Sequence, residues 1–206
     1  MTPSDQPPPP PPSFSPSQSV TSGTSAGSTS ATAGRVGALL ISKQQIADRV
    51  AELGAQISED YAGRSPLLVG ILKGAFVFMA DLSRAISAPV EFDFMAVSSY
   101  GNSTRTSGVV RILKDLDHEI EGRDIIIIED IVDSGLTLSY LRKNLLARRP
   151  ASLEIAALLS RAEAAPLPVE VRYVGFEIPN EWVVGYGLDV AERYRELSDI
   201  FIYDRG

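Results

Sequence analysis

Blocks of apolar residues alternate with polar stretches from about residue 40 onward, and the spacing inside each block predicts its secondary structure. Ser42 and Gln45 have the spacing of a helix capping box, and the apolar stripe behind them predicts a helix that ends around Tyr61. Further helices are expected up to Ala85 and after Thr137, where apolar residues again recur at helical spacing. Short apolar runs predict strands at residues 66–72, 90–98, 109–113, 124–128, 151–159 and 169–175.

Strands and helices alternate along the chain, which predicts an α/β fold with a parallel, twisted sheet flanked by helices. One strand is distinctive, because residues 125–128 are four consecutive isoleucines and are therefore apolar on both faces. Acidic and small polar residues follow this run at Glu129, Asp130, Asp133, Ser134, Gly135 and Thr137. We expect them in a loop at the carboxyl end of the strand, before a helix begins, which is where open α/β sheets bind ligands.

The N–H groups of residues 134–137 and the dipole of the following helix favour an anion such as a phosphate monoester. A plainer interpretation is that Asp133 and Ser134 only cap the helix and that the acidic pair, Glu129 and Asp130, is a solvated turn. Capping does not explain two carboxylates directly behind an all-apolar strand, where desolvation is costly unless something binds them. A cation and a ribose diol would be suitable partners.

Two other predicted strands lead into polar segments. Lys73 and Gly74 follow the strand at 66–72, and an amine next to a glycine that permits close backbone approach suits a polyanion. A polar segment at 99–108 opens with Ser99 and Tyr100, and its plainest interpretation is a disordered hairpin tip.

The C-terminal part of the chain is rich in glycine and aromatic residues, and Trp182 is the only tryptophan. It lies between acidic residues and the start of a predicted strand. By its position it is either a core aromatic or a flat apolar face that stacks on a heterocycle.

Composition narrows the classes of function. The net charge of −7 argues against a general nucleic-acid binder, and the absence of cysteine excludes disulfides and thiol chemistry. A multi-histidine metal centre is excluded because His118 is the only histidine, and it lies in a charged run that we expect on the surface. No apolar run approaches the roughly 20 residues that span a bilayer, and the N-terminus lacks signal-peptide features, so we expect a cytoplasmic protein with no membrane partner.

Residues 1–35 are of low complexity, with six prolines at 7–12 followed mainly by serine, threonine, glycine and alanine. Such a composition predicts a disordered tail, and the folded domain is expected at residues 36–206. Docking of the proline run on a groove that binds polyproline helices is a less favoured alternative.

Together these motifs resemble the type I phosphoribosyltransferases, and in particular the hypoxanthine-guanine phosphoribosyltransferase family. The segment 125–137 resembles the family's motif for phosphoribosyl pyrophosphate, and residues 72–74 resemble its pyrophosphate loop, in which the Leu72–Lys73 peptide would be cis. Residues 176–189 resemble its C-terminal hood. The resemblance covers about residues 40–203 and implies the type I phosphoribosyltransferase fold, with a small hood built mainly from about residues 165–206.

The resemblance implies transfer of a phosphoribosyl group from phosphoribosyl pyrophosphate to N9 of a 6-oxopurine, with Mg²⁺ and in a homodimer or homotetramer. It implies Asp133 as general acid/base near the purine N7. It assigns Glu129 and Asp130 to the ribose hydroxyls or the metal, and Asp133, Ser134, Gly135, Leu136 and Thr137 to the 5′-phosphate. Pyrophosphate is assigned to Lys73, Gly74 and Arg195. The purine is assigned to Arg161, Trp182, Val183 and Asp189, with Asp189 also a ligand of the metal, and Ser99 and Tyr100 open a flexible loop that closes over the site.

Arg161 stands where the family usually has a lysine that donates to the purine O6. Arginine also donates to an oxygen, but with a planar fork and a different reach, so the preference among hypoxanthine, guanine and xanthine stays open. One alternative function is a regulator that keeps this fold and binds nucleotides or RNA without catalysis. Another is an adenine- or uracil-specific transferase, which the 6-oxopurine type of hood disfavours.

Overall fold

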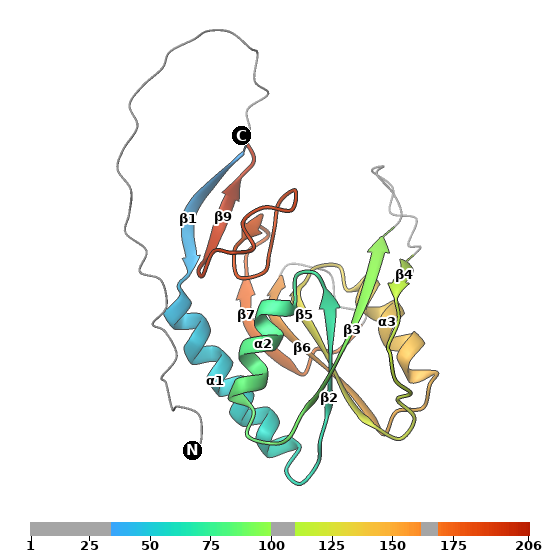
Figure 1. Ribbon diagram of the computed structural model, residues 1–206. Coiled ribbons are helices and arrows are strands. Elements are labelled where there is room, and N and C mark those ends of the chain that lie inside the picture. Colours follow the sequence, from blue (N-terminus) through green and yellow to red (C-terminus); the bar gives the residue numbers. More distant parts are fainter. Residues whose placement is uncertain (1–33, 100–109, 162–168) are drawn as a thin grey trace, which may run out of the picture. The chain divides into compact units, whose positions relative to one another are not determined.

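The computed structural model describes residues 34–99, 110–161 and 169–206 (Figure 1). The expected tail lies outside these residues up to residue 33, as do Tyr100 and the rest of the polar segment up to residue 109. Within the described part of the chain, no helix is long and apolar enough to cross a membrane.

The central sheet has six strands in the order β4-β3-β2-β5-β6-β7. These are β2 (Leu67–Leu72), β3 (Glu91–Ser99), β4 (Val110–Lys114), β5 (Asp124–Val132), β6 (Ser152–Arg161) and β7 (Tyr173–Ile178). All neighbouring strands are parallel except β3 and β4, which form an antiparallel pair. The carboxyl ends of β2, β5, β6 and β7 therefore meet at one edge of the sheet.

Helices cover both faces of this sheet. These are α1 (Lys43–Asp60), α2 (Phe76–Ala85) and α3 (Leu136–Leu146). Buried residues of α1 and α2 form one hydrophobic cluster with Ile126 and Ile128, and buried residues of α3 form a second cluster with Ile125 and Ile127. The isoleucine run thus alternates between the two layers, which confirms the predicted α/β fold and the strand buried on both faces.

A second sheet forms the hood and has three antiparallel strands in the order β1-β9-β8. These are β1 (Arg35–Ile41), β8 (Val183–Val184) and β9 (Ile200–Asp204), and Figure 1 shows β1 beside β9 although they lie at opposite ends of the described chain. The strand β1 was not predicted from the sequence.

Most predicted boundaries lie within a few residues of the observed ones. The Ser42–Gln45 capping box is formed, with Ser42 Oγ accepting from Gln45 N and Gln45 Oε1 accepting from Ser42 N at 2.9 Å. The strand predicted at 169–175 is displaced, because Val169 and Val171 pack on the core from an irregular segment and pairing with β6 begins only at Tyr173. β5 continues to Val132, so the expectation that the acidic pair lies in a loop is wrong.

Asp93 is a buried carboxylate in β3, the strand next to the edge strand β4, and is 3% exposed. It accepts hydrogen bonds from the N–H groups of Phe94 (2.7 Å) and Asp117 (2.8 Å) and from Lys114 Nζ at 3.5 Å. Burial alone would raise the pKa of Asp93, but these donors together lower it. His118 is exposed, as expected, and its Nδ1 lies 3.8 Å from the same carboxylate.

We predict that Asp93→Asn lowers the free energy of unfolding by about 1–3 kcal/mol at pH 7, because buried donors lose a charged acceptor. The pKa of Asp93 is lower in the folded than in the unfolded chain, so its contribution is present above the unfolded value of about 3.9 and disappears as the pH falls below it. Urea titrations at neutral and acidic pH measure this difference. The exposed Glu119→Gln is the control, and a loss that is equal in the control, or that does not shrink in acid, would contradict the account.

Candidate functional site

A small pocket opens where β5 runs into α3. Its volume is about 130 Å³, and its lining includes Glu129, Asp133, Gly135 and Thr137. Gly135 is the N-cap of α3 with φ of 67° and has no side chain, so neither Asp133 nor Ser134 is the N-cap residue itself. The N–H of Leu136 donates only a long bond of 3.5 Å, to Ser134 Oγ, and the helix dipole favours a phosphate at this end of α3.

The acidic pair lies on β5 itself, and its two carboxylates face different neighbours. Glu129 lines the pocket at the start of α3, whereas Asp130 lies against the backbone of Gly74. Burial, and then the charge of Asp130, raise the pKa of the Glu129 carboxyl well above its usual range. Burial also raises the pKa of Asp130, although the Ile131 N–H donates to it at 2.8 Å. These partly buried acids would gain from a ligand that brings a cation or hydroxyl groups.

The Lys73-Gly74 turn follows β2 and is packed tightly on both sides. The Leu72–Lys73 peptide is cis, as the resemblance implied. A Cβ on Gly74 would lie 1.6 Å from Asp130 Oδ2, and a Cβ on Gly187 would lie 2.3 Å from the carbonyl oxygen of Gly74. Only glycines let the turn fit between the acid of β5 and the hood.

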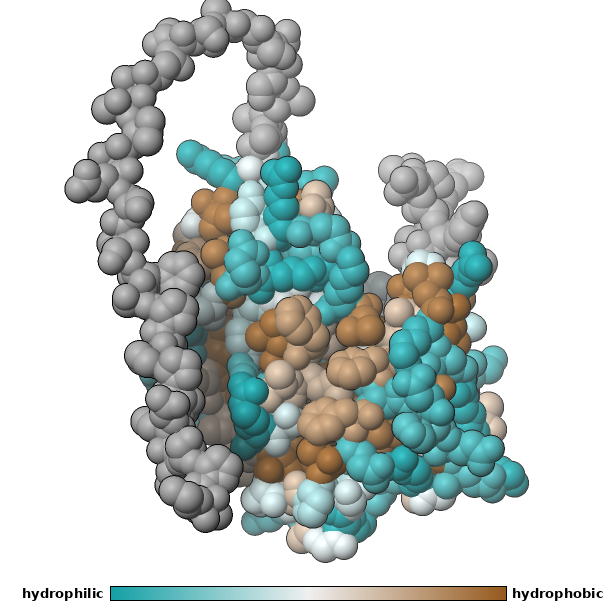
Figure 2. All heavy atoms as spheres, in the orientation of Figure 1, coloured by the Kyte–Doolittle hydropathy of each residue, from teal (hydrophilic) through white to brown (hydrophobic). Residues whose placement is uncertain are grey.

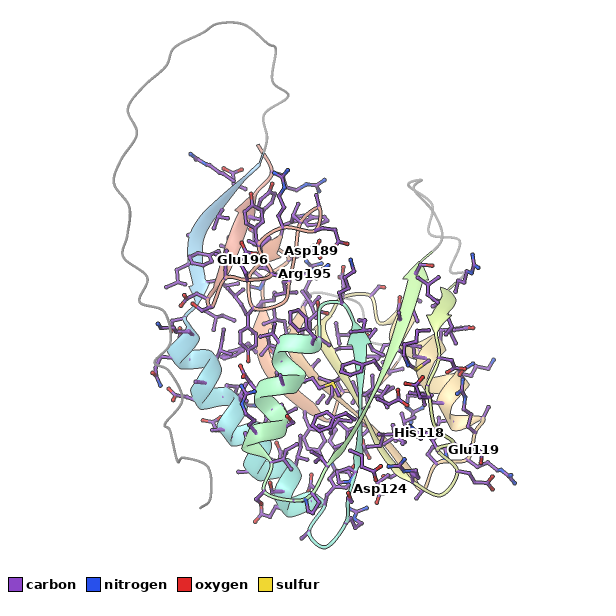
Figure 3. The ribbon with its side chains drawn as sticks, viewed as in Figure 1. His118, Glu119, Asp124, Asp189, Arg195 and Glu196 are labelled. Carbon is purple, nitrogen blue, oxygen red and sulfur yellow. The ribbon has the colours of Figure 1, made fainter. Side chains whose placement is uncertain are left out.

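Residues 185–195, here called the hood loop, surround the side chain of Arg195. Its Nη1 donates to the carbonyl oxygen of Gly187 at 2.7 Å, and its Nη2 lies 2.7 Å from Asp189 Oδ1. Figure 3 shows Asp189 and Arg195 together in this loop. Lys73 Nζ reaches the same loop and donates to Glu192 at 2.9 Å. The two cations expected to bind pyrophosphate therefore both pair with acids of the hood loop.

Arg161, at the end of β6, connects the β5–α3 loop with the hood. Its Nη1 donates to Asp133 Oδ2 at 2.7 Å and its Nη2 to the carbonyl oxygen of Glu181 at 3.1 Å. The side chain is 16% exposed, and its buried Nε has no hydrogen-bond partner within the described chain. The planar guanidinium thus binds two segments at once through two nitrogens in fixed positions. A lysine would offer only one nitrogen, on a flexible stem.

Trp182 lies on the surface of the hood and is 48% exposed, so it is not a core aromatic. The guanidinium carbon of Arg205 lies 4.5 Å from the centre of its ring, a cation–π contact. Val183 follows in β8 and is buried opposite Ile202 of β9. Because Trp182 is half exposed, its indole offers apolar surface to a planar ligand beside its contact with Arg205.

The structure brings most of the expected site residues to the carboxyl edge of the main sheet. Ser99 ends β3, and Tyr100 lies outside the described residues. Among the described residues, no group of three acidic or histidine side chains is arranged to hold a metal ion. Mg²⁺ usually takes only one or two carboxylates and completes its shell with phosphate oxygens and water. Asp130 and Asp189, each of which lies close to Arg195, fit this kind of donor set.

Sequence reasoning missed contacts that fix the hood loop. The Tyr186 hydroxyl donates to Asp81 Oδ2 of α2 at 2.5 Å, and Tyr186 has φ of 52°. Burial and this bond raise the pKa of Tyr186, so its hydroxyl stays protonated and donates. The acidic partner of Lys73, Glu192, was also missed. Both pairs join residues more than 100 positions apart, and no local pattern indicates such a pairing.

We predict that Gly74→Ala destabilises the protein by about 1–3 kcal/mol, because the new methyl group overlaps the Asp130 carboxylate. All three atoms nearest to the added Cβ belong to Asp130. Truncation in the double variant Gly74→Ala/Asp130→Ala should therefore relieve the overlap. A double-mutant cycle from denaturant unfolding should give a coupling of about 1 kcal/mol or more, and additive effects would contradict this packing.

Comparisons with known proteins show the relatives of this chain. The family model of the phosphoribosyl transferase domain matches residues 40–191. The hypoxanthine-guanine phosphoribosyltransferase of Mycobacterium bovis is 55% identical over 177 residues, which cover 83% of this chain and 88% of the relative. The enzyme of that name from Bacillus subtilis is 54% identical over 162 residues, covering 79% and 90%.

A solved structure shares the fold as well. The crystal structure of a hypoxanthine-guanine phosphoribosyltransferase from Bacillus anthracis, with a HEPES molecule in its active site, superposes with a TM-score of 0.78 and 44% identity. The match covers 82% of this chain and 99% of that one. By its sequence, its fold and the motifs at the edge of its sheet, this chain belongs to the hypoxanthine-guanine phosphoribosyltransferase family.

Proposed function

We propose that this protein transfers the 5-phosphoribosyl group of phosphoribosyl pyrophosphate to N9 of hypoxanthine or guanine, giving IMP or GMP and pyrophosphate in purine salvage. The observation that carries the proposal is the 55% identity, over 83% of the chain, to an enzyme named for this activity. The competing interpretation as a regulator without catalysis gains nothing from the comparisons, because the relatives named above are transferases.

The 5′-phosphate would bind at the start of α3. The N–H groups of residues 134–137 would contact its oxygens, and the positive end of the α3 dipole, with a glycine as N-cap, supports this assignment. Glu129 would lie beside the ribose hydroxyls, because it lines the same pocket. A ribose hydroxyl that donates to Glu129 would offset the cost of its partly desolvated charge.

The pyrophosphate group would bind between the Lys73-Gly74 turn and Arg195. Lys73 and Arg195 would supply positive charge, and Gly74 permits close approach of the backbone. Asp130 and Asp189 would hold Mg²⁺ together with the pyrophosphate oxygens. When bound, Mg²⁺ would neutralise charge on the leaving group. Acidic residues near the ribose would favour the positive charge that develops on its ring as pyrophosphate departs.

Asp133 would act on the purine. As N9 forms its bond to C1 of the ribose and the bond from C1 to pyrophosphate breaks, the Asp133 carboxylate would accept the proton that leaves N7. Arg161 Nη1, 2.7 Å from Asp133 Oδ2, would hold this carboxylate in position. The same guanidinium would donate to O6, so a 6-amino purine would leave that donor unpaired. Trp182 would stack on the ring, and the backbone of Val183 would contact its edge.

The remaining proposals concern the whole protein. We propose a homodimer or homotetramer, because large apolar side chains such as Phe76 (46% exposed) and Phe92 (50%) lie on the surface. Figure 2 shows apolar side chains gathered on the face that α2 and β3 occupy in Figure 1. We also propose residues 36–206 as the transferase domain, residues 1–35 as a tail, and a cytoplasmic location, since phosphoribosyl pyrophosphate is too highly charged to cross membranes unaided.

A spectrophotometric assay with phosphoribosyl pyrophosphate and Mg²⁺ tests the function, with hypoxanthine, guanine, xanthine and adenine offered separately. We expect nucleotide from hypoxanthine or guanine and none from adenine. Asp133→Asn should lower kcat by about 100-fold or more, because it removes the general base without changing the size of the side chain. Binding of phosphoribosyl pyrophosphate should change only a few-fold.

The matched control is Asp117→Asn, which removes an exposed acid far from the site and should leave the rate unchanged. Turnover of adenine would contradict the 6-oxopurine assignment. Binding of phosphoribosyl pyrophosphate without turnover of any base would contradict the enzymatic function and favour the regulator.

A further inference from the structure

One carboxylate oxygen of the hood loop lies between the two cations assigned to pyrophosphate. Glu192 Oε2 is 2.9 Å from Lys73 Nζ and 3.4 Å from Arg195 Nη2. These cations come from segments more than 100 residues apart, and a single acidic oxygen bridges them. An oxygen of bound pyrophosphate would make the same two contacts that this carboxylate oxygen makes.

The backbone of the loop fixes this arrangement. Ala191, Glu192 and Tyr194 have φ of 52°, 64° and 79°, values that non-glycine residues rarely adopt. The Glu192 N–H donates to Asp189 Oδ2 at 2.8 Å, and Asp189 in turn pairs with Arg195. Residues in such conformations persist only where the surroundings hold them, and they cluster at ligand sites. The position of Glu192 is thus built into the loop.

The carboxylate is also easy to displace. The side chains of Glu192 and Lys73 are each 65% exposed, so Glu192 would turn into water without exposing apolar surface. An ion pair this exposed is weak because solvent screens it. The hydrogen bond from Lys73 and then its charge lower the pKa of Glu192, so the carboxylate is ionised at neutral pH.

We propose that Glu192 is a resident anion of the pyrophosphate site, which bridges Lys73 and Arg195 between turnovers and which pyrophosphate must displace to bind. This inference rests on the proposed function for the identity of the ligand. The contacts of Glu192 with Lys73 and Arg195 must break before pyrophosphate binds, and breaking them costs free energy. Glu192 therefore weakens the affinity for pyrophosphate and promotes its release after each turnover. Glu192 is in this sense a positioning residue, since it acts through the two cations and not on the reacting atoms.

The test is isothermal titration of the full-length protein with magnesium pyrophosphate. Glu192→Gln keeps the backbone N–H bond to Asp189 but removes the charge. The matched control is Glu196→Gln, which removes the same charge at a position four residues after Glu192 (Figure 3). The side chain of Glu196 is exposed and makes no ion pair in the described part of the chain. Lys73→Gln tests the binding site itself, and near-ultraviolet circular dichroism checks that each variant is folded.

We expect Glu192→Gln to bind pyrophosphate about two- to fivefold tighter than the wild type at low salt, the range that corresponds to an exposed ion pair. The gain should shrink at about 0.5 M salt, because the charges are exposed. Glu196→Gln should show less than half of this gain, and Lys73→Gln should bind more weakly than the wild type.

Weaker or unchanged binding by Glu192→Gln, or an equal gain in Glu196→Gln, would overturn the proposal. If Lys73→Gln still loses affinity in that case, the pyrophosphate site stands and only the role of Glu192 fails. If Lys73→Gln binds as the wild type does, pyrophosphate binds elsewhere, and the assignment of the site and the inference drawn from it fail together.

Discussion

Burial of β5 on both faces is the constraint on which the rest of the structure depends. Ile126 and Ile128 pack under α1 and α2, while Ile125 and Ile127 pack under α3, so the strand cannot slip by one residue without exchanging its two layers. β5 continues beyond the isoleucines, so the alternation of its side chains between the two faces extends to Glu129 and Asp130. Alternation then directs Glu129 to the start of α3 and Asp130 to the turn after β2. One buried strand thereby serves two parts of the site.

The hood meets the main sheet through close backbone contacts and paired charges. Gly187 lies on the carbonyl of Gly74, and Arg161 reaches from β6 to the carbonyl of Glu181. Three cations of the site each pair with an acid of the same site: Arg161 with Asp133, Arg195 with Asp189 and Lys73 with Glu192. Each of these three cations therefore has an acidic partner in the structure.

Much of the fold followed from the sequence, because local patterns carry it. The capping box at Ser42, the isoleucine run and the turn at Lys73 each predicted an element that the structure contains. Pairings between distant segments did not follow. β1 is stabilised by β9 at the other end of the chain, and Tyr186 by Asp81, so neither could be recognised locally. β5 was predicted too short because charged residues usually mark the end of a strand, whereas here the strand continues through Glu129 and Asp130 to Val132.

The most direct test of this account is a crystal structure of the protein with GMP bound. The account predicts that the phosphate contacts the N–H groups of residues 134–137 at the start of α3. It also predicts that the ribose hydroxyls lie beside Glu129 and that the guanine ring lies on Trp182, with its O6 near Arg161. A nucleotide bound elsewhere, or with its phosphate away from the start of α3, would contradict it.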